Sequence, residues 1–166
     1  RIAGLRADIR KVSLESLKKK RRLTGDINVL ADWFIRQLPG GGIDGLKSEF
    51  EDFIAMNGEI ECIYLLDSSG AQISDTISGP LILSRNRPGI FAPAARGANH
   101  SFKPYYTCFE ALGVKRYLTD VYLSLASGNL CRTFSVKLDF ANGDGNILCI
   151  DFLEEAIRNE HATTAD

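Results

Sequence analysis

Residues His100–Gly113 read HSFKPYYTCFEALG and separate two strand-like regions of the chain. The region before this stretch contains ECIYLLDSSGAQISDTI, and the region after it contains YLTDVYLSLASGNLCRTFSV. Four aromatic or apolar residues in the stretch are spaced by four, three and three: Phe102, Tyr106, Phe109 and Leu112. This spacing predicts a helix that turns these side chains toward a core. A helix across a sheet, with a lysine and tyrosines near its start, is also typical of a lid over a small-molecule pocket.

The strand-like region before the helix begins where the helical period ends. Residues 60–66 alternate in a pattern that predicts a strand with one well-buried face. Asp67–Gly70 predicts a tight turn, and residues 71–77 are expected to form the return strand of a hairpin. Residues 78–99 hold three of the five prolines and predict a long loop. Loops of this length are usually functional or mobile.

After the helix, the sequence predicts three strands joined by tight turns. These are residues 116–126, 130–140 and 147–153, and the third is apolar enough to be a central strand. The turns are expected at residues 127–129 and 142–145, and a helical exit at 154–160. The expected fold class is therefore α+β, with an antiparallel sheet of about five strands and long N-terminal helices.

The N-terminal third of the chain is predicted to be helical. Residues 1–22 form an amphipathic pattern, and an apolar stripe continues over residues 23–38 until Pro39 and the glycines that follow it. A second helix is expected to begin near Asp44, whose carboxylate is suited to capping. Its expected buried face consists of Leu46, Phe50, Phe53 and Ile54.

The composition is that of an ordinary soluble globular chain of 166 residues, with 45% hydrophobic residues and a mean hydropathy of -0.07. A net charge of -1 gives no electrostatic reason to expect nucleic acid or an anionic membrane as a partner. The basic run Lys18–Arg22 is more typical of a solvated helix face than of a phosphate site. We see no membrane-spanning stretch and no signal peptide. Because the first residue is Arg1, we expect the chain to be a piece of a longer protein.

The four cysteines are far apart in the sequence and include no CxxC pair. Three of them lie in strand-like runs, where cysteine usually acts as a small buried hydrophobic residue. We therefore expect free thiols, with no metal and no cofactor. Free thiols favour a reducing compartment, so a cytoplasmic location is expected, with the periplasm as the alternative. The four residues are Cys62, Cys108, Cys131 and Cys149.

Several motifs, in this order, resemble those of the PAS-like sensor domains called Cache or PDC domains. IYLLDSSGAQIS is similar to the first hairpin of that family, and ILCIDF is similar to its terminal strand. HSFKPYY resembles the family's helix motif, which usually has arginine where this chain has Lys103. The resemblance covers roughly residues 13–155.

Within that family, the chain most resembles the PAS-like regulatory domain attached to bacterial EAL phosphodiesterase domains. EAL and GGDEF domains destroy and make cyclic di-GMP, and we identify no catalytic signature of either in this chain. The resemblance implies a non-catalytic sensor, with a signalling domain attached outside it. It divides the chain into a helical extension (1–22), a sensor domain (23–155) and a tail or linker (156–166).

The candidate ligand-binding residues follow from the motifs and from strand phase. They are His100, Lys103, Tyr105, Tyr106, Tyr122, Ser124, Arg132 and Asp151. Together they predict a pocket for an anionic or zwitterionic small molecule of the carboxylate or amino-acid class, because a buried cation needs a partner charge. The alternative to a ligand contact for Lys103 is a solvated position at the surface. Asp151 is more typical of a residue that starts the exit helix than of an amine partner.

Two other functions stay open at this point. A structural dimerisation module without a ligand is the main alternative, and a homodimer through residues 1–38 is expected in either case. A small-molecule enzyme using His100 and Asp120 is less favoured, because no catalytic constellation surrounds the histidine. Capping or a surface position is the simpler role for His100.

Overall fold

The structure is a computed structural model, and it describes residues 2–38, 45–83, 90–138 and 145–154. Its helices are α1 (Ile2–Gln37), α2 (Leu46–Met56), α3 (Pro80–Leu83) and α4 (Pro104–Leu112). Its strands are β1 (Ile60–Leu66), β2 (Ile77–Ser78), β3 (Arg116–Leu118), β4 (Tyr122–Leu123), β5 (Leu130–Leu138) and β6 (Asn146–Leu153).

The first helix is continuous where the sequence predicted an extension followed by a separate helix. α1 passes through residue 22 without a break, because its lysines, arginines and leucines are all good helix formers. The chain divides into two compact units, Arg1–Gln37 and Leu38–Asp166. The domain bounds 1–22, 23–155 and 156–166 stay a prediction.

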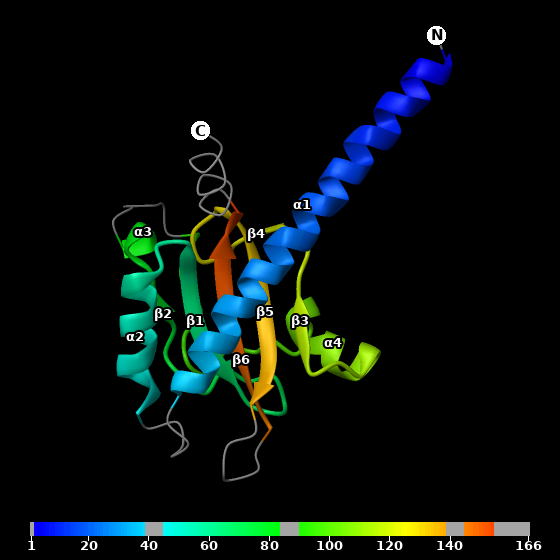
Figure 1. Cartoon of the computed structure of the whole chain (residues 1–166). Coiled ribbons are helices and arrows are strands. Elements are labelled where there is room, and N and C mark those ends of the chain that lie inside the picture. The colour runs from blue at the N-terminus through cyan, green and yellow to red at the C-terminus, as the bar shows by residue number, and fades with distance from the viewer. Residues whose placement is uncertain (1, 39–44, 84–89, 139–144, 155–166) are drawn as a thin grey trace. The chain divides into compact units, whose positions relative to one another are not determined.

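The described strands form one antiparallel sheet, as predicted. The order is β2-β1-β6-β5-β3, and β4 pairs with β5 beyond the end of β3 (Figure 1). β6 lies between β1 and β5 and is buried along its whole length, which confirms the apolar run as a central strand. The fold class is therefore α+β.

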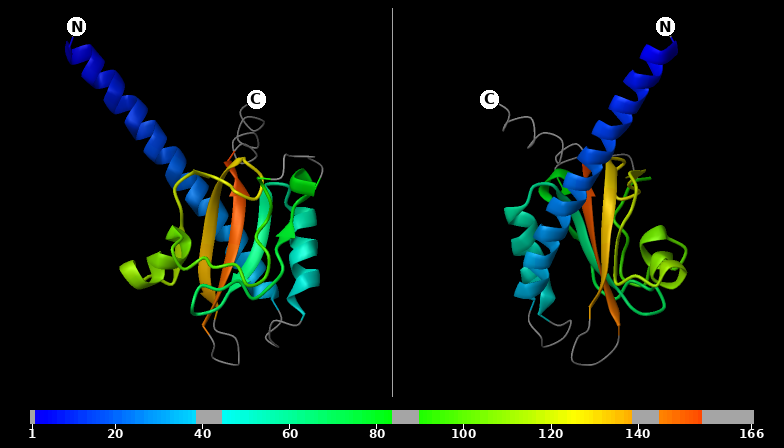
Figure 2. Two further views of the ribbon diagram at one scale, coloured as in Figure 1. Left: turned by 180° about the vertical axis from the view of Figure 1, so that it is seen from behind. Right: turned by 45° about the vertical axis from the view of Figure 1, so that its right-hand side comes forward.

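Helices α2 and α4 lie on opposite faces of this sheet (Figure 2). α2 buries Leu46, Phe50, Phe53 and Ile54 as predicted. Its N-cap is Gly45 without a side-chain cap bond, and the expected cap Asp44 lies outside the described residues. On the other face, side chains of α4 pack with Cys62, Tyr64 and Leu66 of β1. Because both faces are covered, β1 is buried on both sides, whereas the sequence predicted one buried face.

Two predicted strands are shorter than expected. In the return segment 71–77, side-chain bonds replace part of the ladder, because the Leu65 amide donates to Ser74 Oγ at 2.9 Å. Regular pairing with β1 is limited to β2 at Ile77–Ser78, beside one isolated bridge from Leu66 to Gln72. The strand predicted over 116–126 is divided into β3 and β4 by residues 119–121.

The predicted core stripe of the central helix is wrong in its phase. The helix begins only at Pro104, whose fixed φ suits the first helical turn, so Phe102 lies before it and is 69% exposed. The face that is buried consists of Tyr105, Cys108 and Phe109. Leu112 at the C-terminal end is 62% exposed, and Tyr106 is half-buried.

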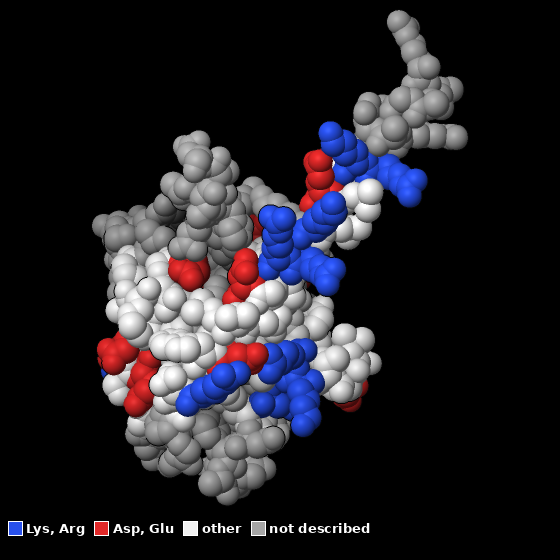
Figure 3. Space-filling model, viewed as in Figure 1, with Lys and Arg blue, Asp and Glu red and all other residues white. Residues whose placement is uncertain are grey.

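Some predictions lie outside the described residues, namely most of the turn at 142–145 and the exit helix after Glu154. Among the described residues, no helix combines the length and the apolar character that crossing a bilayer requires. The face seen in Figure 3 carries basic and acidic side chains near one another.

Candidate ligand-binding site

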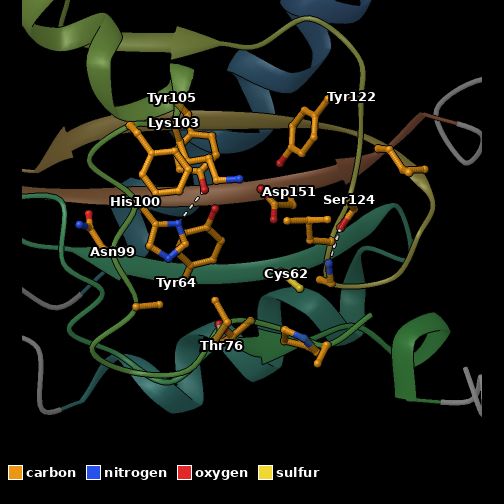
Figure 4. Close-up of a pocket in the computed structure, with 18 residues that line it drawn as sticks. Cys62, Tyr64, Thr76, Asn99, His100, Lys103, Tyr105, Tyr122, Ser124 and Asp151 are labelled. Carbon is orange, nitrogen blue, oxygen red and sulfur yellow. Dashed lines mark hydrogen bonds between the residues drawn. The ribbon is translucent and has the colours of Figure 1, made fainter. Parts of the chain in front are cut away.

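A cavity of about 280 Å³ lies on the face of the sheet that carries α4 (Figure 4). Side chains of β1 and β6 line it, together with residues of the segments 92–103 and 122–126. Six of the eight predicted site residues line this cavity: His100, Lys103, Tyr105, Tyr122, Ser124 and Asp151.

His100 is held in one tautomer by two buried partners. Its Nε2 lies 3.0 Å from Gln72 Oε1, and its Nδ1 lies 2.7 Å from the Tyr105 hydroxyl. The Gln72 amide nitrogen donates to Thr76 Oγ1, so the amide oxygen faces His100 and can only accept. Nε2 therefore carries the proton, and Nδ1 accepts from Tyr105. Burial, with a smaller contribution from Lys103, lowers the pKa of His100 and favours the neutral ring.

This geometry corrects the role expected for His100. The side chain is buried at 6% exposure and stacks on Tyr64 with ring centroids 5.3 Å apart, so it is neither at the surface nor a helix cap. Both ring nitrogens have partners, which leaves neither available as a general base. Asp120, its partner in the enzymatic alternative, does not line the cavity.

Asp151 supplies a carboxyl group to the cavity floor. Its Oδ1 accepts from Thr133 Oγ1 at 2.6 Å, and Thr133 Oγ1 lies 2.5 Å from the Tyr122 hydroxyl. Because Thr133 has one hydroxyl proton and gives it to Asp151, Tyr122 is the donor in the second bond. Burial raises the pKa of Asp151 to about 7, with Glu61 acting in the same direction and the Thr133 bond and Lys103 opposing it.

Lys103 carries the positive charge of the cavity. It occupies the N-cap position of α4 in an extended conformation, which the following Pro104 favours. In Figure 4 its side chain points across the cavity toward Asp151. The ammonium also lies 5.2 Å from the centre of the Phe102 ring, within the range of a cation–π contact.

Tyr105 and Ser124 complete the set of predicted lining residues. The Tyr105 hydroxyl is committed to His100, and burial raises its pKa far above the usual value. Ser124 is 3% exposed, and its Oγ accepts from the Ala126 amide at 3.2 Å. Tyr122 and Ser124 both line the cavity, but Leu123 and Leu125 of the opposite strand phase line it too, so the shared phase does not account for this placement.

The other two predicted site residues lie elsewhere. The Tyr106 hydroxyl donates to the Ser68 carbonyl at 2.9 Å, and its ring packs against the turn at Gly70, where an added Cβ would lie 3.0 Å from it. Arg132 does not line the cavity. Its Nε donates to Glu154 at 2.9 Å and its Nη1 to the Thr119 carbonyl, so its charge is neutralised inside the protein. Tyr106 and Arg132 are thus held away from the cavity by partners on distant segments.

Several lining residues were not predicted from the sequence. Cys62 and Tyr64 lie on the cavity face of β1, and Thr76, Asn99 and Phe102 lie in the segments before α4. The alternation of residues 60–66 placed Cys62 and Tyr64 on one face, but it did not show that this face meets the helix. Burial raises the pKa of the Cys62 thiol far above its usual value, so this group is neutral.

The chain contains the three-residue sequence from which the EAL domain takes its name. Glu110, Ala111 and Leu112 form the tripeptide Glu-Ala-Leu at the end of α4. All three residues are exposed and lie outside the cavity lining. The tripeptide is therefore part of a helix surface, away from the candidate site.

Comparisons with known proteins connect the fold to solved structures. No protein-family model matches the chain, and no curated protein matches it. The Bacillus subtilis YkuI protein, a protein with an EAL domain solved with cyclic di-GMP and calcium, matches with a TM-score of 0.63 at 19% identity. The match covers 90% of this chain and 37% of that one.

Chemoreceptor domains share the same fold. The ligand-binding domain of the Campylobacter jejuni chemoreceptor Tlp3, in complex with L-norvaline, matches with a TM-score of 0.62 at 14% identity and covers 86% of this chain and 55% of that one. The ligand-binding domain of the Pseudomonas fluorescens chemoreceptor CtaA, in complex with L-isoleucine, matches with a TM-score of 0.54 at 14% identity and covers 87% and 55%. This chain thus spans less than two thirds of each of these proteins, and they show its fold.

Proposed function

We propose that this chain is a non-catalytic sensor domain whose cavity binds a small zwitterionic molecule of the amino-acid class. The observation that carries the proposal is the presence of one cation and one anion, Lys103 and Asp151, in the lining of a single cavity. A free amino acid presents the complementary pair of charges on adjacent atoms. The proposal assigns the ligand carboxylate to Lys103 and the ligand ammonium to Asp151.

The two charges are available to a ligand. Among the ion pairs of the described residues, none joins Lys103 to Asp151, and Asp151 uses one oxygen for Thr133. Charged groups that gain a charged partner in a partly desolvated site form the stronger kind of hydrogen bond. Lysine acts here as a point charge, without the bidentate geometry that the family's usual arginine would give.

The rest of the lining favours an apolar ligand side chain. Phe102, Leu123 and Leu125 line the cavity and are 69%, 54% and 63% exposed. Apolar surface left in contact with water gains free energy when a ligand covers it. The chemoreceptor domains with this fold are solved with L-norvaline and L-isoleucine, which supports aliphatic amino acids as the first candidates.

The cavity volume also bears on the signalling context. At about 280 Å³ it is at the lower end of ligand pockets and suits an amino acid. Cyclic di-GMP, with two bases, two sugars and two phosphates, is much larger. We therefore infer that any link to cyclic di-GMP runs through an attached EAL or GGDEF domain, which the resemblance and the match to YkuI support.

A matched ligand series tests this proposal. L-Isoleucine carries both charges, 3-methylpentanoic acid lacks the ammonium, and 2-methylbutylamine lacks the carboxylate. Ligand binding to the folded state raises the melting temperature. The melting temperature in the presence of each compound, measured by calorimetry, therefore reports how tightly that compound binds. We expect L-isoleucine or a related amino acid to bind at least about tenfold more tightly than either analogue, a difference of about 1.4 kcal/mol. Equal binding of all three, or no binding of any amino acid, would overturn the proposal.

The second candidate function is dimerisation without a ligand. The exposed apolar residues Val12, Leu14 and Leu17 of α1 favour contact with a second copy of the chain. Both functions can reside in one signalling domain, since α1 and the cavity involve separate residues. A dimer whose cavity accepts no amino acid would favour this alternative.

A further inference from the structure

A β-bulge brings an acidic side chain close to two residues that line the ligand cavity. The register of β1 on β6 shifts between Ile60, which pairs with Phe152, and Cys62, which pairs with Asp151. Glu61 is the extra residue of this bulge. In a regular strand Glu61 and Cys62 would point to opposite faces. Here a carboxylate oxygen of Glu61, one of Asp151 and the Cys62 sulfur all lie within 4.8 Å of one another.

Only one of the two oxygens of the Glu61 carboxylate accepts hydrogen bonds from the protein. The residue is 1% exposed, and its Oε1 accepts from the Ser127 hydroxyl and, at 3.5 Å, from Asn129 Nδ2. Its Oε2 is fully buried and has no hydrogen-bond partner. Leaving a carboxylate oxygen buried without a partner costs free energy, and such a group in a native fold calls for an explanation.

No ion pair among the described residues compensates this carboxylate, and the Lys103 ammonium points toward Asp151. Asp151, 5% exposed, is a second buried carboxylate, and two such groups in a low-dielectric site repel each other. The ion pairs among the described residues include none to Glu61 or Asp151, and the buried Arg132 is committed to Glu154. A bound cation would supply both the missing partner and the missing charge.

We propose that Glu61, Cys62 and Asp151 form a binding site for a divalent transition-metal ion of the Zn²⁺ type. Two carboxylates and one sulfur are ligands for borderline metals, whereas Ca²⁺ and Mg²⁺ prefer oxygen alone. Cys62 and Asp151 also line the cavity, which gives the ion a path of entry and leaves its remaining coordination position open to the cavity. On binding, the Cys62 thiol releases its proton to the solvent and coordinates as the thiolate.

This site has a consequence for the sensor. Asp151 would serve both the metal ion and the ligand ammonium, so the two compete for it. The three proposed metal-binding residues do not need a bound amino acid in order to hold the ion. The metal site therefore does not depend on the proposed function. Metal binding is therefore measured on the ligand-free chain.

Cobalt(II) is the probe for the decisive experiment, because a thiolate bound to Co²⁺ gives a charge-transfer band in the near ultraviolet. The whole chain, without a histidine tag and fully reduced, is titrated with Co²⁺ and then with Zn²⁺. We expect one equivalent of Co²⁺, a charge-transfer band, and displacement of Co²⁺ by Zn²⁺. Cys62→Ser should abolish the band, and Cys108→Ser, which removes a buried thiol outside this cluster, should leave it intact.

Glu61→Gln tests the acidic ligand and is expected to fold, since it keeps an acceptor for Ser127 and removes one of two repelling charges. Its affinity for Zn²⁺ should fall at least about tenfold. Thermal unfolding gives an independent readout, in which Zn²⁺ raises the melting temperature of the parent chain but not of Glu61→Gln. Absence of Co²⁺ binding at 100-fold excess, or a band that survives Cys62→Ser, would overturn the proposal. Failure of the amino-acid series alone would leave the metal site standing.

Discussion

Thr133 and Asp151 are directly opposite each other on β5 and β6, and the threonine hydroxyl donates to the carboxylate at 2.6 Å. Since the Tyr122 hydroxyl donates to the same threonine at 2.5 Å, a chain of two hydrogen bonds runs from the cavity wall to its floor. This chain occupies Asp151 Oδ1 and leaves the other oxygen for a ligand.

Thr133→Val should therefore destabilise the protein and weaken ligand binding. Valine has the shape of threonine, but it leaves the half-buried Tyr122 hydroxyl without its acceptor and the buried Asp151 without its donor. The expected cost is about 1–3 kcal/mol in the free energy of unfolding, measured by urea denaturation. Thr107→Val on α4, outside the cavity lining, is the control. Equal stability of Thr133→Val and the parent chain would contradict the assignment of these bonds.

Lys103→Ala should weaken amino-acid binding at least about tenfold and leave the melting temperature without ligand nearly unchanged. The reason is that the ammonium lines the cavity and forms no ion pair with Asp151 among the described residues. Lys103→Arg should retain binding. Lys137→Ala removes an exposed lysine over the Phe109 ring, outside the cavity, and serves as the matched control in calorimetry. Similar affinities for the alanine variants at 103 and 137 would reject Lys103 as the carboxylate partner.

The Arg132→Ala variant should be less stable to unfolding than the parent chain, without any direct effect on the ligand site. Its guanidinium forms a buried ion pair with Glu154 at 2.9 Å, and removing one member of such a pair typically costs about 3–5 kcal/mol. The double variant Arg132→Leu with Glu154→Leu should recover part of the loss, because neither charge is then left alone. Chemical denaturation of the parent chain and the two variants measures this. A double variant less stable than Arg132→Ala would show that the buried charge of Glu154 is not the cause.

His100 should make the protein sensitive to acid. Its pKa is lowered in the fold from 6.5, so the unfolded state binds the proton more readily. Its contribution to stability is complete above pH 6.5 and is lost as the pH falls from there through the folded pKa. The groups facing it are Tyr64 of β1, Tyr105 and Lys103 at the start of α4, and the Gln72 amide.

Urea denaturation between pH 7.5 and pH 5 checks this expectation. The free energy of unfolding of the parent chain should decrease more steeply with falling pH than that of His100→Gln, which cannot take up a proton. Equal slopes for the two proteins would contradict a depressed pKa at His100.

Homodimer formation through α1 is expected at micromolar concentration. Leu14 and Leu17 are 49% and 63% exposed on this helix, and burial against a second copy would remove them from water. Sedimentation should show a dimer for the parent chain and a monomer for Leu14→Glu with Leu17→Glu. Lys11→Glu, an exposed change on the same helix, should remain dimeric. A monomeric parent chain at high micromolar concentration would count against this interface.

The sequence by itself determined the elements whose pattern is local. Alternation and apolar runs fixed β1, β5 and β6, and the helical period fixed α2 with its buried face at Leu46 and Phe50. These patterns are readable because each follows from the geometry of one helix or one strand. The resemblance of HSFKPYY and of the later strands to a sensor family also indicated six of the residues that line the cavity.

Only the tertiary structure decided which side chains pair with one another and which face the cavity. Arg132 carried the same charge signal as Lys103 in the sequence, yet it pairs with Glu154, 22 residues away, while Lys103 faces the cavity. Phe102 fitted the apolar spacing but lies before the first turn of α4, so it is exposed. The alternation of residues 60–66 predicted that Glu61 lies on the face opposite to Cys62. A one-residue bulge instead brings its carboxylate close to Asp151. Register shifts and long-range pairs depend on segments distant in the chain, and no local period encodes them.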